Sequence, residues 1–388
     1  AGVVDRHLRS APPLCVDGIL VIQGQDQLRA VDAYHGTLLW TRSFEGLSRM
    51  AVSLDSGYQA ADAGELWLAQ ANVLRCVDLR TGLDLREVRA PVRMEFGWLA
   101  LDKERVLVSI QPEGTSRREQ SYGEVDLQFK DEQPLICSQM LIAYDRDSVR
   151  RLWKREFRCV PNSSLALSGG RIFGVEAREA AGSGRVLPAT VGQAGPTLFA
   201  LDVERGRPIF DLALDLADMR HALFVSVRDD TLVVTTSHTF SDDVSGFYLQ
   251  VRNASDGALR WTAHTPNNGA GSSHGEQVHH PVLLENVLVA EPRAYDLASG
   301  AILSDGKWWM PKRRGCGTLS ASADTLYFRD HNPRARKIDG PTVHVTSVSR
   351  PGCWINILPA AGLVLLPEAS AGCVCSFPVQ TSMAFLPR

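Results

Sequence analysis

The chain has 388 residues, of which 44% are hydrophobic and 22% charged, a composition typical of a globular protein. Its net charge of −3 gives no electrostatic reason to expect nucleic acid or an anionic membrane as a partner. No apolar run approaches the roughly 18 residues of a membrane-spanning helix, so we expect no transmembrane segment. The sequence begins at Ala1 without a signal peptide, and we expect it to be a processed mature chain.

The first predicted unit consists of four short strands, at residues 14–16, 19–23, 28–32 and 38–41. Its third and fourth strands are joined by a turn in which Gly36 follows Asp32. Glycine provides the positive φ that a tight turn requires, and the aspartate side chain bonds to the turn backbone. The same pair recurs as Asp78 with Gly82, Asp202 with Gly206, Asn253 with Gly257 and Asp296 with Gly300.

Seven further units follow, at residues 50–88, 96–157, 163–212, 222–264, 282–303, 317–348 and 354–387. Asp145 begins a degenerate turn in which Val149 replaces the glycine. Tryptophans at equivalent places in the fourth strands, Trp40, Trp153 and Trp261, are expected to pack between neighbouring sheets. Such a recurrence, without sustained helical periodicity, predicts an all-β fold. We expect a single eight-bladed β-propeller of four-stranded antiparallel blades, forming one domain over residues 1–388.

Three long polar insertions, at residues 112–134, 178–196 and 237–246, fall between the second and third strands of their units. In a propeller this loop and the connection between units lie on the same face, which we call the upper face. Function concentrates in such loops on a rigid scaffold. We also expect residues 3–8 to supply the outer strand that the last unit lacks.

The copies that end in "VDAYHGTLLW" and "NASDGALRW" resemble the PQQ-like repeats of quinoprotein alcohol dehydrogenase-type propellers, whose fold the BamB-type outer-membrane assembly lipoproteins share. Segments such as "RRGCGTLSAS" and "HHPVLLENVLVAEPRAYDLASG" are similar to large secreted or envelope proteins of planctomycete-type bacteria. The resemblance implies a periplasmic, secreted or envelope-associated protein. A true quinoprotein dehydrogenase would hold its quinone against an adjacent Cys-Cys disulfide. Here Val374 separates Cys373 from Cys375, which disfavours PQQ as a cofactor.

The C-terminal quarter is rich in cysteine, which favours disulfides or a metal site. We expect Cys316, Cys353, Cys373 and Cys375 to meet on the upper face over the last two units. Disulfides are the favoured interpretation, and metal binding and free thiols are the alternatives. The pairing stays open, because four cysteines allow three connectivities.

A histidine-rich segment, "NNGAGSSHGEQVHHPV", precedes the sixth unit and offers candidate ligands for a divalent metal in His274, Gln277, His279 and His280. Solvated histidines in a polar loop are the competing interpretation. A second candidate site is a ligand-binding rim at the starts of the inner strands, formed by Arg49, Trp98, Asn162, His221, Trp354 and Asn356. Aromatic and amide groups around the mouth of the ring suit a ligand of the size of a sugar or a quinone, whereas simple packing of the channel is the alternative.

Three functions remain open from the sequence. The first is an extracytoplasmic binding or scaffold propeller that engages a protein or glycan through its upper face. The second is a metal-assisted, lyase-like carbohydrate enzyme that uses the segment from His274 to His280. The third is a quinoprotein oxidoreductase. The sequence does not decide whether the chain is an enzyme, and it names no catalytic residue.

Overall fold

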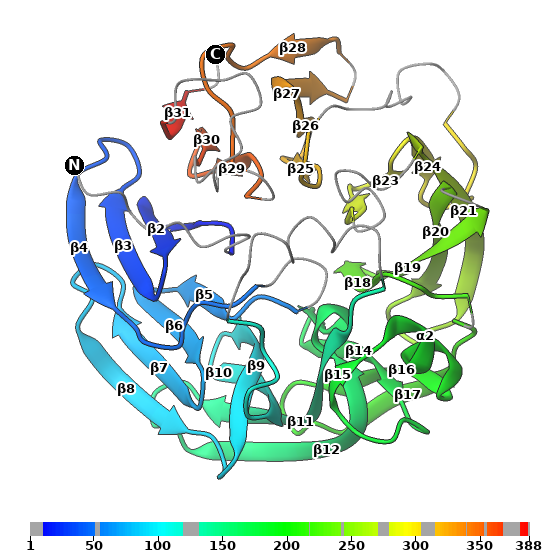
Figure 1. Cartoon of the computed structure of the whole chain (residues 1–388), viewed down its shortest axis with the longest axis horizontal. Helices are drawn as coiled ribbons and strands as arrows, with labels where there is room; N and C mark the ends of the chain where they lie inside the picture. The colour runs from blue at the N-terminus through cyan, green and yellow to red at the C-terminus, as the bar shows by residue number, and fades with distance from the viewer. Residues whose placement is uncertain are drawn as a thin grey trace.

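A computed structural model describes residues 11–50, 55–118, 132–216, 218–241, 244–270, 279–303, 315–338, 340–352, 355–367 and 381–386. These residues form eight antiparallel sheets arranged in a ring, as Figure 1 shows. The predicted eight-bladed β-propeller is confirmed. The sheets are numbered here as blades 1 to 8 in chain order.

Each of the first four blades has four strands that follow one another in the sheet. Blade 1 has β1 (Leu14–Val16), β2 (Ile19–Gly24), β3 (Gln27–Asp32) and β4 (Leu38–Ser43); blade 2 has β5 (Gln59–Asp62), β6 (Glu65–Gln70), β7 (Val73–Asp78) and β8 (Asp84–Arg89). Blade 3 has β9 (Met94–Asp102), β10 (Arg105–Pro112), β11 (Leu135–Asp145) and β12 (Arg151–Pro161). Blade 4 has the short helix η1 (Asn162–Ser164), then β13 (Ala166–Ser168), β14 (Arg171–Ala177), β16 (Pro196–Asp202) and β17 (Pro208–Ala213).

The remaining blades vary more in strand length. Blade 5 has β18 (Leu223–Arg228), β19 (Thr231–Ser241), β20 (Val244–Asn253) and β21 (Leu259–Ala270); blade 6 has β22 (Val282–Leu283), β23 (Val287–Ala290) and β24 (Arg293–Asp296). Blade 7 has β25 (Ser320–Ala321), β26 (Thr325–Asp330), β27 (Asn332–Lys337) and β28 (Thr342–His344); blade 8 has β29 (Leu358–Ala360), β30 (Leu363–Leu366) and β31 (Met383–Phe385). A single bridge between Tyr295 and Ile302 stands in the place of a fourth strand in blade 6. Residues 3–8, the expected outer strand of blade 8, lie outside the described residues.

The repeated turn glycine explains how one blade is joined to the next. The indole Nε1 of Trp40 in β4 donates a hydrogen bond to the carbonyl oxygen of Leu79 at 3.0 Å, and the ring packs against Gly82. A Cβ added to Gly82 would lie 2.7 Å from that ring. Trp153 docks on Gly206 and Trp261 on Gly300 in the same way, each donating to the carbonyl that follows the turn aspartate. The fourth-strand tryptophans therefore pack between neighbouring sheets, as predicted.

The three insertions adopt different structures. The insertion of blade 4 contains β15 (Gly184–Val186), which pairs with β11 of blade 3, and the short helix α2 (Pro188–Gln193). The insertion predicted at 237–246 is instead a continuation of β19 and β20, whose ladder reaches the pair Ser241 and Val244. Residues 119–131 of the first insertion lie outside the described part of the chain. Because the strands of each sheet follow one another in chain order and are antiparallel, the described insertion of blade 4 and the connections between blades lie on the same, upper face.

Candidate functional site

A cluster of buried polar side chains lies where blades 2, 3 and 4 meet at the starts of their inner strands. Its members are Arg49, Asp55, Glu95, Ser109, Gln111, Ser116, Ser138 and Asn162, all less than 5% exposed. We call this group the buried polar cluster. Two of them, Arg49 and Asn162, belong to the predicted ligand-binding rim.

Arg49 is fully buried at one end of the cluster. Its guanidinium donates to the carbonyl oxygens of Phe96 at 3.0 Å and Gly97 at 2.6 Å, lies 3.5 Å from the carboxylate of Asp55, and stacks 4.2 Å from the ring centre of Tyr58. Burial lowers the pKa of Arg49, and the charge of Asp55 opposes that effect. Because buried charges are costly unless they are paired, these contacts hold the guanidinium in one position.

Asn162 forms the other end of the cluster. Its amide nitrogen donates to Asp55 and to Gln111, both at 2.8 Å, and its amide oxygen accepts hydrogen bonds from the hydroxyls of Ser109 at 3.1 Å and Ser138 at 2.6 Å. The amide thus uses both its donor and its acceptor capacity inside the protein. The side chain joins blade 4 to blades 2 and 3 and does not present a free group to a ligand.

Glu95 carries the second carboxylate of the cluster. Burial opposes its ionisation, but the charge of Arg118 and hydrogen bonds from Ser116 and Gln111 outweigh burial and hold the pKa of Glu95 below its usual value. Arg118 lies 2.9 Å from the Glu95 carboxylate and is partly exposed. The cluster is therefore a network of ion pairs and hydrogen bonds that fastens the segment after β10 to the rest of the protein.

The other rim residues that are described lie outside this cluster or only touch it, as Trp98 does through its backbone nitrogen, which donates to the hydroxyl of Ser109 at 2.7 Å. Trp98 is buried in the hydrophobic layer between blades 3 and 4, and His221 is half-buried with its pKa lowered by burial. The side-chain amide of Asn356 donates a hydrogen bond to the hydroxyl of Thr318 at 3.1 Å. Its backbone is in the left-handed region, with φ of 65°. Trp354 lies outside the described residues. The rim as a ligand-binding site stays a prediction.

The histidines that precede blade 6 point to different partners. His279 is buried, and its Nδ1 lies 3.1 Å from the carboxylate of Glu291. His280 packs against Phe224 with ring centres 4.6 Å apart and the ring planes tilted by 40°, and burial lowers the pKa of His280. Residues 271–278, with His274 and Gln277, are not among the described residues. Within the part of the chain that is described, no three histidine, cysteine or acidic side chains gather as metal ligands would.

Of the four C-terminal cysteines, only Cys316 falls in the described residues, where it is half-buried. Cys353, Cys373 and Cys375 lie in segments that are not described. Their meeting on the upper face therefore stays a prediction.

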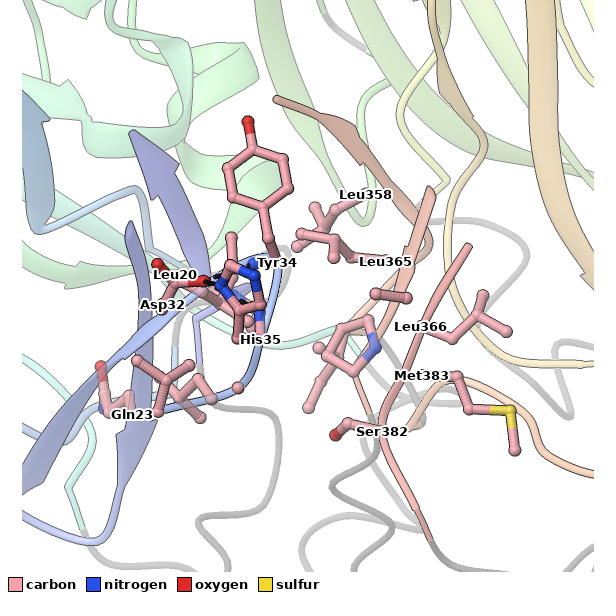
Figure 2. A pocket seen from close by; sticks show the side chains of 18 of the residues that line it. Leu20, Gln23, Asp32, Tyr34, His35, Leu358, Leu365, Leu366, Ser382 and Met383 are labelled. Carbon is pink, nitrogen blue, oxygen red and sulfur yellow. Dashed lines mark hydrogen bonds and ion pairs between the residues drawn. The ribbon is translucent and has the colours of Figure 1, made fainter. Parts of the chain in front are cut away.

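A cavity of about 420 Å³ lies between blades 1 and 8, where the two ends of the ring meet. Figure 2 shows Leu20, Asp32 and His35 on the blade 1 side of the cavity and Leu365 and Met383 on the blade 8 side. The lining is mostly apolar. Sequence reasoning missed this cavity, because its walls come from the first and last units.

The turn of blade 1 forms the polar part of this cavity. The carboxylate of Asp32 accepts hydrogen bonds from the backbone nitrogens of Tyr34 and His35 at 2.9 and 2.8 Å. These bonds, the one from His35 most strongly, lower the pKa of Asp32. The carboxylate is thus used to shape the turn that carries Gly36, as in the other copies of the repeat.

The arrangement of its sheets makes the chain an eight-bladed β-propeller. A family model described as "Outer membrane protein assembly factor BamB" matches residues 137–308. No curated protein sequence matches the chain. No helix of the described residues has the length and apolar character needed to cross a membrane.

Several solved structures are similar in fold. BamB from Moraxella catarrhalis is 16% identical with a TM-score of 0.48, over 85% of this chain and 80% of that one. Kuenenia stuttgartiensis hydrazine synthase is 11% identical with a TM-score of 0.48, over 88% and 99% of the two chains. The quinohemoprotein alcohol dehydrogenase from Comamonas testosteroni is 10% identical with a TM-score of 0.44, over 92% and 77%. At these identities the likeness concerns the fold alone.

Proposed function

We propose that this protein is an extracytoplasmic scaffold that binds a protein partner through its upper face. The observation that carries the proposal is the internal use of Arg49 and Asn162, which donate hydrogen bonds to the carbonyl oxygen of Gly97 and to the carboxylate of Asp55. Because these side chains are engaged inside the protein, we expect a partner to contact the insertions instead. The family match to a BamB model supports a protein rather than a glycan as the partner.

The insertion of blade 4 is braced before any partner binds. Its strand β15 pairs with β11, and Arg185 in β15 donates to the carbonyl oxygen of Thr115 at 2.9 Å. From the other side, Arg158 in β12 donates to the carbonyl oxygen of Ala180 at 2.7 Å. A surface held in this way loses less conformational entropy on binding than a free loop would.

Leu187 provides a direct test, because this apolar side chain is 43% exposed at the start of α2, on the upper face. Apolar side chains at the centre of an interface contribute much of its binding energy. We expect Leu187→Asp to weaken capture of the partner from an envelope extract at least about tenfold, which corresponds to roughly 1.4 kcal/mol.

The matched control is Leu259→Asp. Leu259 is 52% exposed, but it follows the turn of blade 5 and so belongs to the opposite face. Crosslinking followed by mass spectrometry would identify what each variant captures. Equal capture by both variants and the unchanged protein would exclude the braced insertion as the binding surface, and recovery of glycan alone would favour the alternative class of partner.

A further inference from the structure

Two cysteines that showed no pattern in the sequence lie together inside blade 3. Cys137 is in β11 and Cys159 is in β12, and these strands pair with Cys137 directly opposite Pro161. Because side chains alternate along a strand, Cys159, two residues from Pro161, lies on the same face of the sheet as Cys137. Both side chains are fully buried and pack in the same apolar layer against blade 4.

Cys137 and Cys159 are free thiols in the structure, and their side chains lie close enough to interact. Burial, and then this interaction, raise the pKa of the Cys137 thiol well above its usual value. A thiol that stays protonated and out of water is a poor nucleophile. This environment does not suit a reactive catalytic cysteine.

A structural zinc site would require further ligands beside the two sulfurs. In the described part of the chain, no group of three or more metal-binding side chains includes these cysteines. Cys137 is enclosed by strand partners on both sides, because it pairs with Gly184 of β15 as well as with Pro161. The surroundings fit a covalent link between the two strands better than a metal ion.

We propose that Cys137 and Cys159 form a disulfide when the protein folds in an oxidising compartment. The Sγ–Sγ bond forms as both S–H bonds break, and two protons pass to solvent. The two electrons pass to a disulfide-bearing oxidant, such as a thiol–disulfide oxidoreductase, which is reduced to its dithiol. The reaction precedes the final burial of the thiols, because an oxidant has no access to them in the folded blade.

Such a bond would fasten the strand pair that supports the buried polar cluster. Ser138 follows Cys137 directly, and Asn162 lies three residues after Cys159; their side chains are hydrogen-bonded at 2.6 Å. The covalent link and the hydrogen bond would then hold the same end of β11 and β12. The inference needs an oxidising location but does not depend on the proposed binding partner.

The test is thiol mapping of the full chain exported to an oxidising compartment. The unreduced protein is denatured in iodoacetamide and digested. We expect a linked peptide pair joining Cys137 to Cys159, two hydrogens lighter than the separate peptides, and no alkylation at either residue. Recovery of both residues as alkylated thiols from that compartment would overturn the proposal.

A second measurement compares melting temperatures before and after reduction. We expect reduction to lower the Tm of the unchanged protein by about 3–6 °C more than it lowers that of Cys159→Ser. Cys76→Ser is the matched control, because Cys76 is equally buried in blade 2 and contacts Arg86 rather than another cysteine. If reduction changed the Tm of the unchanged protein and of Cys159→Ser equally, the Cys137–Cys159 disulfide would be contradicted. If Cys159→Ser does not fold, the peptide map of the unchanged protein still tests whether the disulfide forms.

Discussion

At the scale of single residues, the buried polar cluster depends on close approach between side chains and backbone. Gly97 is the clearest case, because its carbonyl oxygen accepts a hydrogen bond and the absence of a Cβ leaves room for neighbouring side chains. The carbonyl accepts a hydrogen bond from Arg49. The space where a Cβ would stand is filled by Ser109, Gln111 and Asn162.

We expect Gly97→Ala to destabilise the protein by about 2–4 kcal/mol, since overpacking and broken buried hydrogen bonds both contribute. An added Cβ would lie 2.5 Å from the hydroxyl of Ser109 and 2.7 Å from the amide oxygen of Gln111. Urea unfolding measures the loss. Gly57→Ala is the control, because a Cβ there meets nothing within 4 Å, and an equal loss in both variants would contradict the role given to the cluster.

The lowered pKa of Glu95 predicts a pH dependence of stability. The folded protein holds this carboxylate ionised more strongly than the unfolded chain does. Its contribution is therefore complete above the unfolded pKa, about 4.3, and is lost as the pH falls through the lower folded value. We expect Glu95→Gln to be less stable than the unchanged protein at neutral pH, with the difference shrinking in acid.

Chemical unfolding at a series of pH values measures that difference. Glu113→Gln serves as a control at an exposed position close in sequence. A difference for Glu95→Gln that grows as the pH falls would have the wrong sign and would exclude the ion pair with Arg118 as its cause.

At the scale of secondary-structure elements, neighbouring blades are joined by a side chain four residues after the turn glycine. Trp40 of blade 1 docks on the turn of blade 2 in this way. In blade 2 the equivalent residue is Arg86, which donates a hydrogen bond to the carbonyl oxygen of Asp147 in the turn of blade 3 at 2.8 Å. The turn of blade 1 is different, because a Cβ built on Gly36 meets no atom within 4 Å. That turn opens into the cavity beside blade 8.

This arrangement sharpens the expectation that residues 3–8 complete blade 8. Ala11 and Pro13, which follow that segment, line the cavity, and β31 is the last strand of a three-stranded sheet among the described residues. We expect deletion of residues 1–8 to lower the Tm, and a synthetic peptide of residues 1–10 to restore it in trans. The change in Tm with added peptide measures the binding.

Two glycine variants make the test specific to the cavity. Gly36→Val would place its side chain in the space beside blade 8, whereas Gly64→Val carries similar backbone strain, with φ of 77° against 69°, and faces open space elsewhere. In the shortened protein, the first change should abolish the peptide effect and the second should preserve it. Peptide rescue that survives Gly36→Val would place the segment elsewhere.

At the scale of the whole molecule, the sequence determined the fold because the repeat is local. The spacing from Asp32 to Gly36, and its copies, specify a turn and two strands within a few residues. Eight such units cannot bury their faces alone, so they stack into a ring. The unit boundaries followed from the same pattern, although strand lengths did not: the continuation of β19 and β20 into a polar stretch depends on pairing between the strands.

The chemistry of the sites was decided only by the tertiary structure. Nothing local marks Asn162 as a joint between three blades, because its partners Asp55 and Gln111 are more than fifty residues away in the chain. Cys137 and Cys159 are adjacent for the same reason, through the register of β11 and β12. The repeat spacing follows from short-range backbone geometry. The partners of a buried polar side chain depend instead on which distant strands meet, and no short stretch of sequence specifies that pairing.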